Sequence, residues 1–295
     1  TAVSYSNVIA MVDAVTVQVL RSKISSLVDE MHYHFYRSGY STIIRESRDF
    51  SCVILDRTGG LIIAPPMFFH APVYKHLVSR ILELYGEDGL KPGDVFVCNH
   101  PYEGGLPHVS DMAFTAPVIV DGRLIGFSGS IAHKADIGGT NPGSTSASST
   151  EIYQEGLLLP PIRIQEAGTP IADIERLILA NTRQPGLVQG DMRAQIAATE
   201  MGVRRLAEIC CRFGADVVED TFTAILDGAG RELRRAVAAL PDGVASAEGY
   251  MDDDGVDLDT PVYFAVTVKV EGEIVMFDFS GSGPQARGPV NLRPS

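Results

Sequence analysis

Residues 112–131 constrain the fold of this chain more than any other stretch, because they read as a two-stranded hairpin. Apolar residues dominate both arms, at 112–120 and 123–131, and Asp121-Gly122 between them is a strong signal for a tight turn. In an antiparallel pair joined by such a turn, the two far ends are neighbours in space. The residues just before 112 and just after 131 are therefore predicted to lie side by side.

Both ends of this hairpin carry the same short unit, a histidine followed three residues later by an aspartate. His108 and Asp111 precede the first arm, and His133 and Asp136 follow the second. Neutral imidazoles and carboxylates together suit Zn²⁺, Mn²⁺ or Fe²⁺. We therefore predict a divalent-metal site with His108, Asp111 and His133 as ligands. Asp136 is predicted either as a further ligand or as the carboxylate that orients an imidazole.

A second interpretation of the same residues stays open. Loop histidines are often hydrogen-bonded to nearby aspartates without binding an ion, and a single His-x-x-Asp unit is a weak motif. If a metal is bound, it would polarise a carbonyl or lower the pKa of a bound water towards about 7.

Residues around the two units complete the predicted site. The short apolar strand 95–98 leads into Asn99 and His100, and Glu155 follows a polar loop at 143–150. His100 and Glu155 are candidates for general acid or base, although each is also open to a structural role. The candidates for substrate contact are Asn99, Tyr102 and the glycine pairs Gly104, Gly105, Gly138 and Gly139.

The remaining patterns predict an α+β fold. Helical periodicity covers 6–38, 73–84, 171–180, 189–213 and the stretch from there to about 240. Strand patterns cover 48–55, 61–64, 95–98 and 249–279. We expect a mixed sheet with the hairpin at its core and long helices, followed by a helical pair and an antiparallel meander. A composition shift suggests two domains, 1–185 with the metal site and 186–295, the second continuing beyond the recorded chain.

Composition excludes several classes of function. The chain has 295 residues and a net charge of −13, which argues against nucleic-acid binding. It contains no apolar run of about 18 residues, so no membrane span is expected. Its four cysteines form no C-x-x-C motif, which is typical of a reduced, cytoplasmic protein. Neither a Walker-type ATP site nor a G-x-S-x-G nucleophile motif is present.

Longer phrases resemble a known family along most of the chain. They resemble the B-type chains of the hydantoinase B/oxoprolinase family, which includes the B-type chains of N-methylhydantoinases, the C-terminal half of 5-oxoprolinases, and the large subunits of acetone and acetophenone carboxylases. The matching phrases are RDFSCVILDRTGGLI (48–62), KPGDVFVCNHPYEGG (91–105), HVSD (108–111), AHKADIGGTNPGS (132–144), STEIYQEGLLLPPIRI (149–164), GDMRAQIAATEMGVRRL (190–206), LPDGVASAEGYMDDDG (240–255) and FDFSGSGPQARGPVN (277–291).

The resemblance implies a partner and a reaction. Family B-type chains work in hetero-oligomers with an A-type subunit that binds and hydrolyses ATP and phosphorylates a carbonyl or enolate oxygen of a small cyclic amide or ketone. The B-type chain then supports hydrolysis of the activated amide or carboxylation. In the carboxylase branch a His-x-x-Asp unit and a later histidine hold a metal, and these map onto His108, Asp111 and His133. The loop from His100 to His108 departs from the usual family form, because it is one residue longer.

The expected function is therefore that of a B-type subunit in an ATP-dependent cyclic-amide hydrolase of the hydantoinase or 5-oxoprolinase type. Mn, Zn or Fe would be bound by this chain, and ATP by the partner. One alternative is a subunit of an ATP-dependent acetone- or acetophenone-type carboxylase. Another is a scaffold without catalytic residues that docks the ATP-binding partner.

Overall fold

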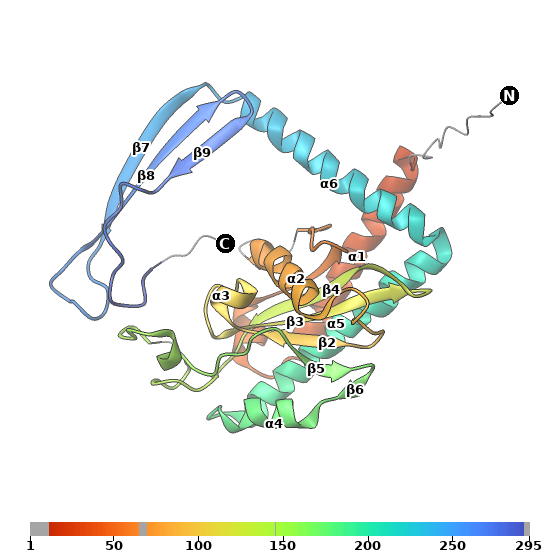
Figure 1. Ribbon diagram of the computed structural model, residues 1–295, viewed down its shortest axis with the longest axis horizontal. Coiled ribbons are helices and arrows are strands. Elements are labelled where there is room, and N and C mark those ends of the chain that lie inside the picture. The colour runs from red at the N-terminus through yellow and green to blue at the C-terminus, as the bar shows by residue number, and fades with distance from the viewer. Residues whose placement is uncertain (1–11, 65–69, 145, 292–295) are drawn as a thin grey trace.

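A six-stranded antiparallel sheet organises the first part of the molecule, in a computed structural model that describes residues 12–64, 70–144 and 146–291 (Figure 1). Its strand order is β1-β4-β3-β2-β5-β6. The strands are β1 (Phe50–Asp56), β2 (Val95–Cys98), β3 (Asp111–Val120), β4 (Arg123–His133), β5 (Ile162–Glu166) and β6 (Thr169–Pro170). The predicted hairpin is the β3–β4 pair, and its turn residues Asp121 and Gly122 have φ of 51° and 78°. Positive φ at both positions matches the two-residue turn that follows the twist of antiparallel strands.

Helices cover both faces of this sheet. They are α1 (Ala14–Ser38), α2 (Ala71–Tyr85), α3 (Pro101–Gly104), α4 (Ala172–Ala180), α5 (Pro185–Phe213) and α6 (Ala215–Ala238). Alternation along β1 shows the two sides: Cys52 and Ile54 pack in a core with α1 and α5, whereas Val53 and Leu55 pack in a core with α2. Each fully buried aliphatic side chain in these cores contributes roughly 1.5–3 kcal/mol to the free energy of folding. The predicted α+β class is confirmed.

A third core supports the loops that follow the hairpin. Ile137 and Leu159, which flank the polar loop, pack with β2, β3, α4 and α5. Helix α5 begins at Pro185, at the expected domain boundary, and its side chains enter the cores on this face of the sheet. The division of the chain at residue 185 stays a prediction.

A second sheet stands away from the first (Figure 1). It contains β7 (Gly243–Met251), β8 (Val262–Glu271) and β9 (Ile274–Asp278) in antiparallel order, and α6 leads into it. Several large apolar side chains on this sheet are at least half exposed, among them Tyr250, Phe264 and Phe277. The connection between β7 and β8 returns to the loop 143–150, since a Cβ built on Gly255 would lie 1.6 Å from the carbonyl oxygen of Ala147.

Two local predictions differ from the structure. Instead of a return strand at 61–64, Leu61 forms only an isolated bridge with Leu55, and the Asp56 carboxylate accepts hydrogen bonds from the backbone of Thr58 and Gly60. The first helix begins at Ala14, and residues 6–11 of the prediction lie outside the described part. Among the described residues, none of the helices combines the length and apolar character that a bilayer crossing requires.

Candidate metal centre

Strand register places two of the three predicted ligands, Asp111 and His133, opposite each other. Asp111, the first residue of β3, pairs with His133, the last residue of β4. Directly opposed side chains have Cβ atoms roughly 4.5–5.5 Å apart. Both residues have the same parity as Ala113 and Ile131, which pack in the α2 core, so both side chains face α2. The hairpin therefore sets Asp111 and His133 together at one end of the sheet.

His108 joins this pair through a turn before β3. The backbone N–H of Asp111 donates to the carbonyl of His108 at 3.2 Å, which folds the histidine back towards the strand end. Its Nε2 lies 3.4 Å from Asp111 Oδ2, while Nδ1 of His133 lies 3.5 Å from Oδ1. The two imidazole rings have centroids 5.0 Å apart. One potential ligand atom from each of the three residues lies within 4.8 Å of the others.

The donor set fits a divalent metal. The Asp111 side chain is 1% exposed, and neither carboxylate oxygen has a hydrogen-bond partner among the described residues. Buried carboxylate oxygens normally have such partners. The nitrogen–oxygen distances of 3.4 and 3.5 Å exceed ordinary hydrogen bonds. Two ligands that each lie about 2.1 Å from one ion are roughly 3.0–3.5 Å apart. Each imidazole nitrogen therefore lies at ligand spacing from one carboxylate oxygen, that of His108 from Oδ2 and that of His133 from Oδ1.

Exposure differs across the cluster and defines an open side. The His108 side chain is 45% exposed, that of His133 is 18% exposed, and Asp111 lies beneath them. Three protein ligands with one accessible side are typical of catalytic metal sites, in which substrate or water takes the remaining position.

Electrostatics favour the ionised form of Asp111. Burial alone would raise the pKa of this carboxyl, but contacts with His133 and His70 and the nearby His108 outweigh burial and hold its pKa well below the ordinary value. A second carboxylate, Asp49, lies 4.0 Å from Nδ1 of His133. Two carboxylates therefore lie beside the imidazoles, a donor set that suits a divalent cation.

Sequence reasoning missed His70 as part of this centre. His70 is fully buried at the start of α2, and its Nε2 lies 3.5 Å from Asp111 Oδ2. It does not belong to the group of ligand atoms within 4.8 Å of one another. A lone loop histidine 41 positions before Asp111 gives no spacing signal, so only the packing of α2 on the sheet reveals it.

A buried lysine lies behind the strand end, on the opposite face of the sheet. Lys134 follows His133, and its ammonium donates to Gln195 Oε1 at 2.6 Å and to the carbonyl of Ala132 at 3.2 Å. Burial lowers the pKa of Lys134 to about 8, while Asp191 and Asp111 act in the opposite direction. This contact ties the end of β4 to α5.

Asp136 has a different environment from the other predicted ligands. One carboxylate oxygen accepts hydrogen bonds from the backbone of Gly138 and Arg183, and the other from the backbone of Gly143 and from Nη1 of Arg183, all at 2.9–3.0 Å. Burial would raise the pKa of Asp136, but these hydrogen bonds lower it to about 2. We leave Asp136 out of the candidate metal set because its oxygens already bind the 138–143 loop.

The two acid–base candidates lie in contrasting positions. Nδ1 of His100 accepts hydrogen bonds from the backbone N–H groups of Tyr102 and Glu103 at 3.2 Å and so caps α3. Glu155 is partly buried and close enough to His108 to interact electrostatically with it. Burial raises the pKa of Glu155, and His108 and the Val109 backbone oppose that rise. Glu155 is thus the better placed of the two for proton transfer at the metal centre.

Most of the predicted substrate contacts have structural partners. The buried amide of Asn99 donates to the carbonyls of Val109 and Leu157 at 2.8 Å and accepts from the backbone of Leu159 at 2.7 Å. Tyr102 lies on α3 with 66% of its surface exposed.

The glycines of the site allow close approaches between backbone segments. A Cβ on Gly104 would lie 2.3 Å from Sγ of Cys98, and Gly105 has a φ of +78°. Gly138 and Gly139 have φ of +89° and +80°, with Asn181 and Gln154 carbonyls at 2.6 and 2.5 Å from the added Cβ positions. These four positions therefore require glycine for the shape of the loops.

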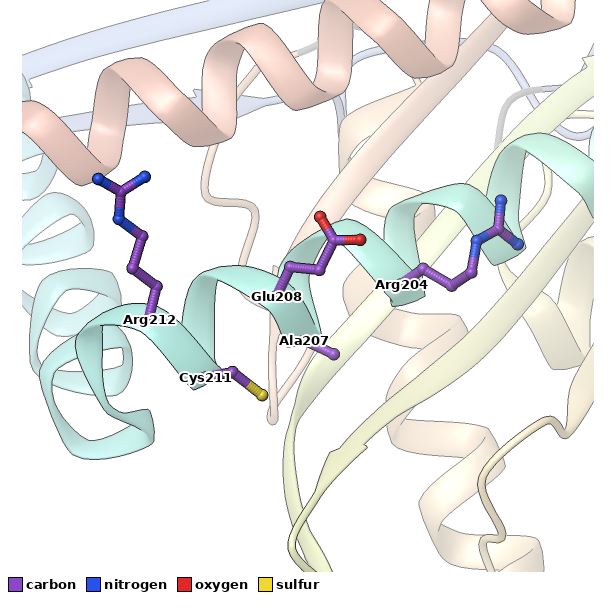
Figure 2. Close-up of a pocket in the computed structure, with 5 residues that line it drawn as sticks. All are labelled: Arg204, Ala207, Glu208, Cys211 and Arg212. Carbon is purple, nitrogen blue, oxygen red and sulfur yellow. The ribbon is translucent and has the colours of Figure 1, made fainter.

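A shallow depression on the molecule lies elsewhere, along α5. Arg204, Ala207, Glu208, Cys211 and Arg212 line it (Figure 2). It shares no residue with the metal centre.

Comparison with known proteins defines the family to which the chain belongs. The hydantoinase B/oxoprolinase family model matches residues 13–295, and the chain belongs to this family. The resemblance inferred from the sequence phrases is thereby confirmed.

Individual relatives include hydrolase subunits. The chain is 35% identical over 292 residues to a protein of Pseudomonas sp. (strain NS671) described as the B-type chain of a D-/L-hydantoinase, covering 95% of this chain and 49% of the relative. It is 28% identical to 5-oxoprolinase 1 of Arabidopsis thaliana, covering 95% of this chain and 24% of that protein. The chain thus spans about half the length of the first relative and about a quarter of the second.

Two solved structures share the fold. The ATP-dependent caprolactamase of Pseudomonas jessenii matches with a TM-score of 0.85 and 27% identity, over 95% of this chain and 48% of the other. Acetone carboxylase in its nucleotide-free form matches with a TM-score of 0.82 and 18% identity, over 92% of this chain and 37% of the other. The second match shows likeness of fold alone.

Proposed function

We propose that this chain forms part of a B-type subunit in an ATP-dependent enzyme that hydrolyses a cyclic amide. An A-type partner would bind ATP and phosphorylate the amide oxygen, and the present chain would supply a metal centre. The observation that carries the proposal is the cluster of His108, Asp111 and His133, with its buried carboxylate and exposed imidazole. Family membership supports the link between this cluster and ATP-dependent chemistry.

Hydrolysis is preferred over carboxylation because of the relatives. The hydantoinase chain at 35% identity and the ATP-dependent caprolactamase at 27% both carry names of amide hydrolases. Acetone carboxylase, at 18% identity, supports the fold but not the reaction. A carboxylase therefore stays the second candidate.

In this proposal each residue has a distinct task. His108, Asp111 and His133 would hold a divalent ion of Mn, Zn or Fe, for which imidazole and carboxylate donors are suited. Such an ion, when bound, polarises a carbonyl oxygen or lowers the pKa of a bound water. Glu155, whose pKa is raised by burial and which interacts electrostatically with His108, would accept or donate a proton there. Tyr102 is the predicted substrate contact whose side chain is exposed on the surface, on α3.

The test combines metal analysis with product analysis. The full chain would be purified in complex with its A-type partner and assayed with ATP on hydantoin, on 5-oxoproline and on a ketone with bicarbonate. We expect about one metal ion per chain and ATP-dependent ring opening, both lost in His108→Ala. His34→Ala, which alters an exposed histidine on α1, is the matched control and should change neither.

Each alternative outcome has a defined meaning. A carboxylated product without ring opening would assign the chain to the carboxylase branch. A complex without metal, in which His108→Ala turns over at the wild-type rate, would leave the chain as a scaffold for its partner and refute the proposal.

A further inference from the structure

A line of buried polar side chains extends from the metal centre into the interface between β1 and α2. His70 Nε2 lies 3.5 Å from Asp111 Oδ2, and His70 Nδ1 lies 3.1 Å from the Ser51 hydroxyl. That hydroxyl lies 2.8 Å from the Tyr74 hydroxyl. Ser51, His70 and Tyr74 are fully buried, and Asp111 is 1% exposed. Four polar groups are therefore aligned away from solvent, which is costly unless each has a partner.

The chemistry of the two ends fixes the direction of this line. The approach of His70 Nε2 to Asp111 Oδ2 at 3.5 Å is longer than an ordinary hydrogen bond, but an ionised carboxylate attracts an N–H and repels a lone pair, so we expect Nε2 to carry the proton that faces Asp111. In a neutral imidazole, Nδ1 is then an acceptor, and the Ser51 hydroxyl must donate to it. The Ser51 oxygen in turn accepts from the Tyr74 hydroxyl, which stays protonated because burial raises its pKa well above the ordinary value.

We propose that His70, held by Ser51 and Tyr74, is a positioning residue that orients the Asp111 carboxylate at the metal centre. This inference rests on the proposed function, because it treats Asp111 as a metal ligand. Partners of this kind behind a ligand typically change metal affinity 10–100-fold when they are removed. His70 would act on the carboxylate itself, and through it on the orientation of the oxygen that faces His133.

The fold supports this role, because the three residues come from elements that meet at the sheet end. Ser51 on β1 pairs in register with Ile131 on β4, two residues before His133. Tyr74 lies near the start of α2, four residues after His70. The packing of α2 on the sheet therefore sets the distance from His70 to Asp111, independently of the loop that carries His108.

The experiment measures Mn²⁺ affinity of the full chain in complex with its A-type partner, after removal of bound metal. His70→Leu should weaken Mn²⁺ binding 10–100-fold and alter the electron paramagnetic resonance spectrum of the bound ion. His70→Gln, which keeps an N–H donor near the Nε2 position, should bind within about threefold of the wild type. His76→Ala, an exposed histidine on the same helix, is the matched control and should leave affinity unchanged.

Rescue by glutamine separates positioning from packing, because a purely structural role would not depend on that donor. If wild-type protein binds Mn²⁺ and His70→Leu binds it equally well, the inference is wrong and the proposed function stands. Should His70→Leu fail to fold, Ser51→Ala serves instead, with a several-fold loss expected and an unchanged affinity counting against the inference. Nitrogen-15 NMR of labelled histidine tests the line without metal: a proton on Nδ1 of His70 would overturn it, even if the wild type bound no Mn²⁺.

Discussion

The role of Asp136 can be decided by one substitution, Asp136→Asn. The sequence made this residue a candidate ligand, whereas in the structure its carboxylate accepts hydrogen bonds from three backbone N–H groups, the Thr182 hydroxyl and the Arg183 guanidinium. An asparagine that keeps its oxygen at the Oδ1 position would turn its NH₂ towards Gly143 N–H and Arg183 Nη1. Two hydrogen bonds would be lost, one of them to a charged group.

The expected cost follows from these two contacts. About 1 kcal/mol for the neutral bond and about 1.5–3 kcal/mol for the charged one give roughly 2–4 kcal/mol, with the lower end favoured because the Arg183 side chain is 42% exposed. For a chain of 295 residues, a loss of that order lowers the Tm by roughly 3–7 °C.

The assay is thermal unfolding together with metal analysis, each over a range of pH. Because hydrogen bonds lower the pKa of Asp136 to about 2 from its ordinary 3.8, its contribution to stability is complete above pH 3.8 and is lost as pH falls towards 2. The difference in Tm between wild type and variant should therefore shrink in that window. Asp173→Asn, whose side chain is 87% exposed, is the control and should be neutral. Loss of bound metal from Asp136→Asn with an unchanged Tm would refute this reasoning and restore Asp136 as a ligand.

Two further substitutions test the loops that carry the site. Gly139→Ala places a Cβ 2.5 Å from the Gln154 carbonyl at a φ of +80°. Urea denaturation should therefore show that the free energy of unfolding falls by about 2–4 kcal/mol. Gly186→Ala, whose Cβ would have nothing within 4 Å, is the control and should be neutral or slightly stabilising. A wild-type midpoint in Gly139→Ala would contradict the close approach. Asn99→Ala leaves one buried carbonyl, one partly buried carbonyl and one buried N–H without their partner and should cost about 3 kcal/mol or more in the same assay. Asn181→Ala, which loses one exposed hydrogen bond, is its control, and equal losses in the two variants would argue against the buried role of Asn99.

The sequence predicted those parts of the site that depend on local pattern. The Asp121-Gly122 turn starts the β3–β4 pairing and brings the two far ends of the hairpin together, as predicted, and a one-residue register shift between Val118 and Ile119, which the sequence did not indicate, then places Asp111 opposite His133. A period-two alternation and a turn signal are both local, so they could be read without knowledge of the fold. The same reasoning brought His108 into the cluster, because only two residues separate it from Asp111.

Residues that meet through tertiary packing could not be predicted in this way. His70 reaches Asp111 because α2 packs on the sheet, and no spacing in the chain encodes that contact. Asp136 shares the His-x-x-Asp spacing of Asp111, yet Arg183, 47 positions later, claims its carboxylate. Asn99 has a side chain typical of binding sites, but its amide joins three backbone segments. In each case a partner distant in sequence decided the role.

The contact between Gly255 and Ala147 links the small sheet β7–β8–β9 to the loop beside the candidate metal centre. Helix α6 joins this sheet to the rest of the molecule at one end (Figure 1), while Gly255 touches the 143–150 loop at the other. In that loop the Ser144 hydroxyl donates to the Gly138 carbonyl at 2.8 Å and accepts from the Ile137 backbone at 2.6 Å. A displacement of the small sheet would therefore be passed through this loop to the segment that follows His133, beside the candidate metal centre.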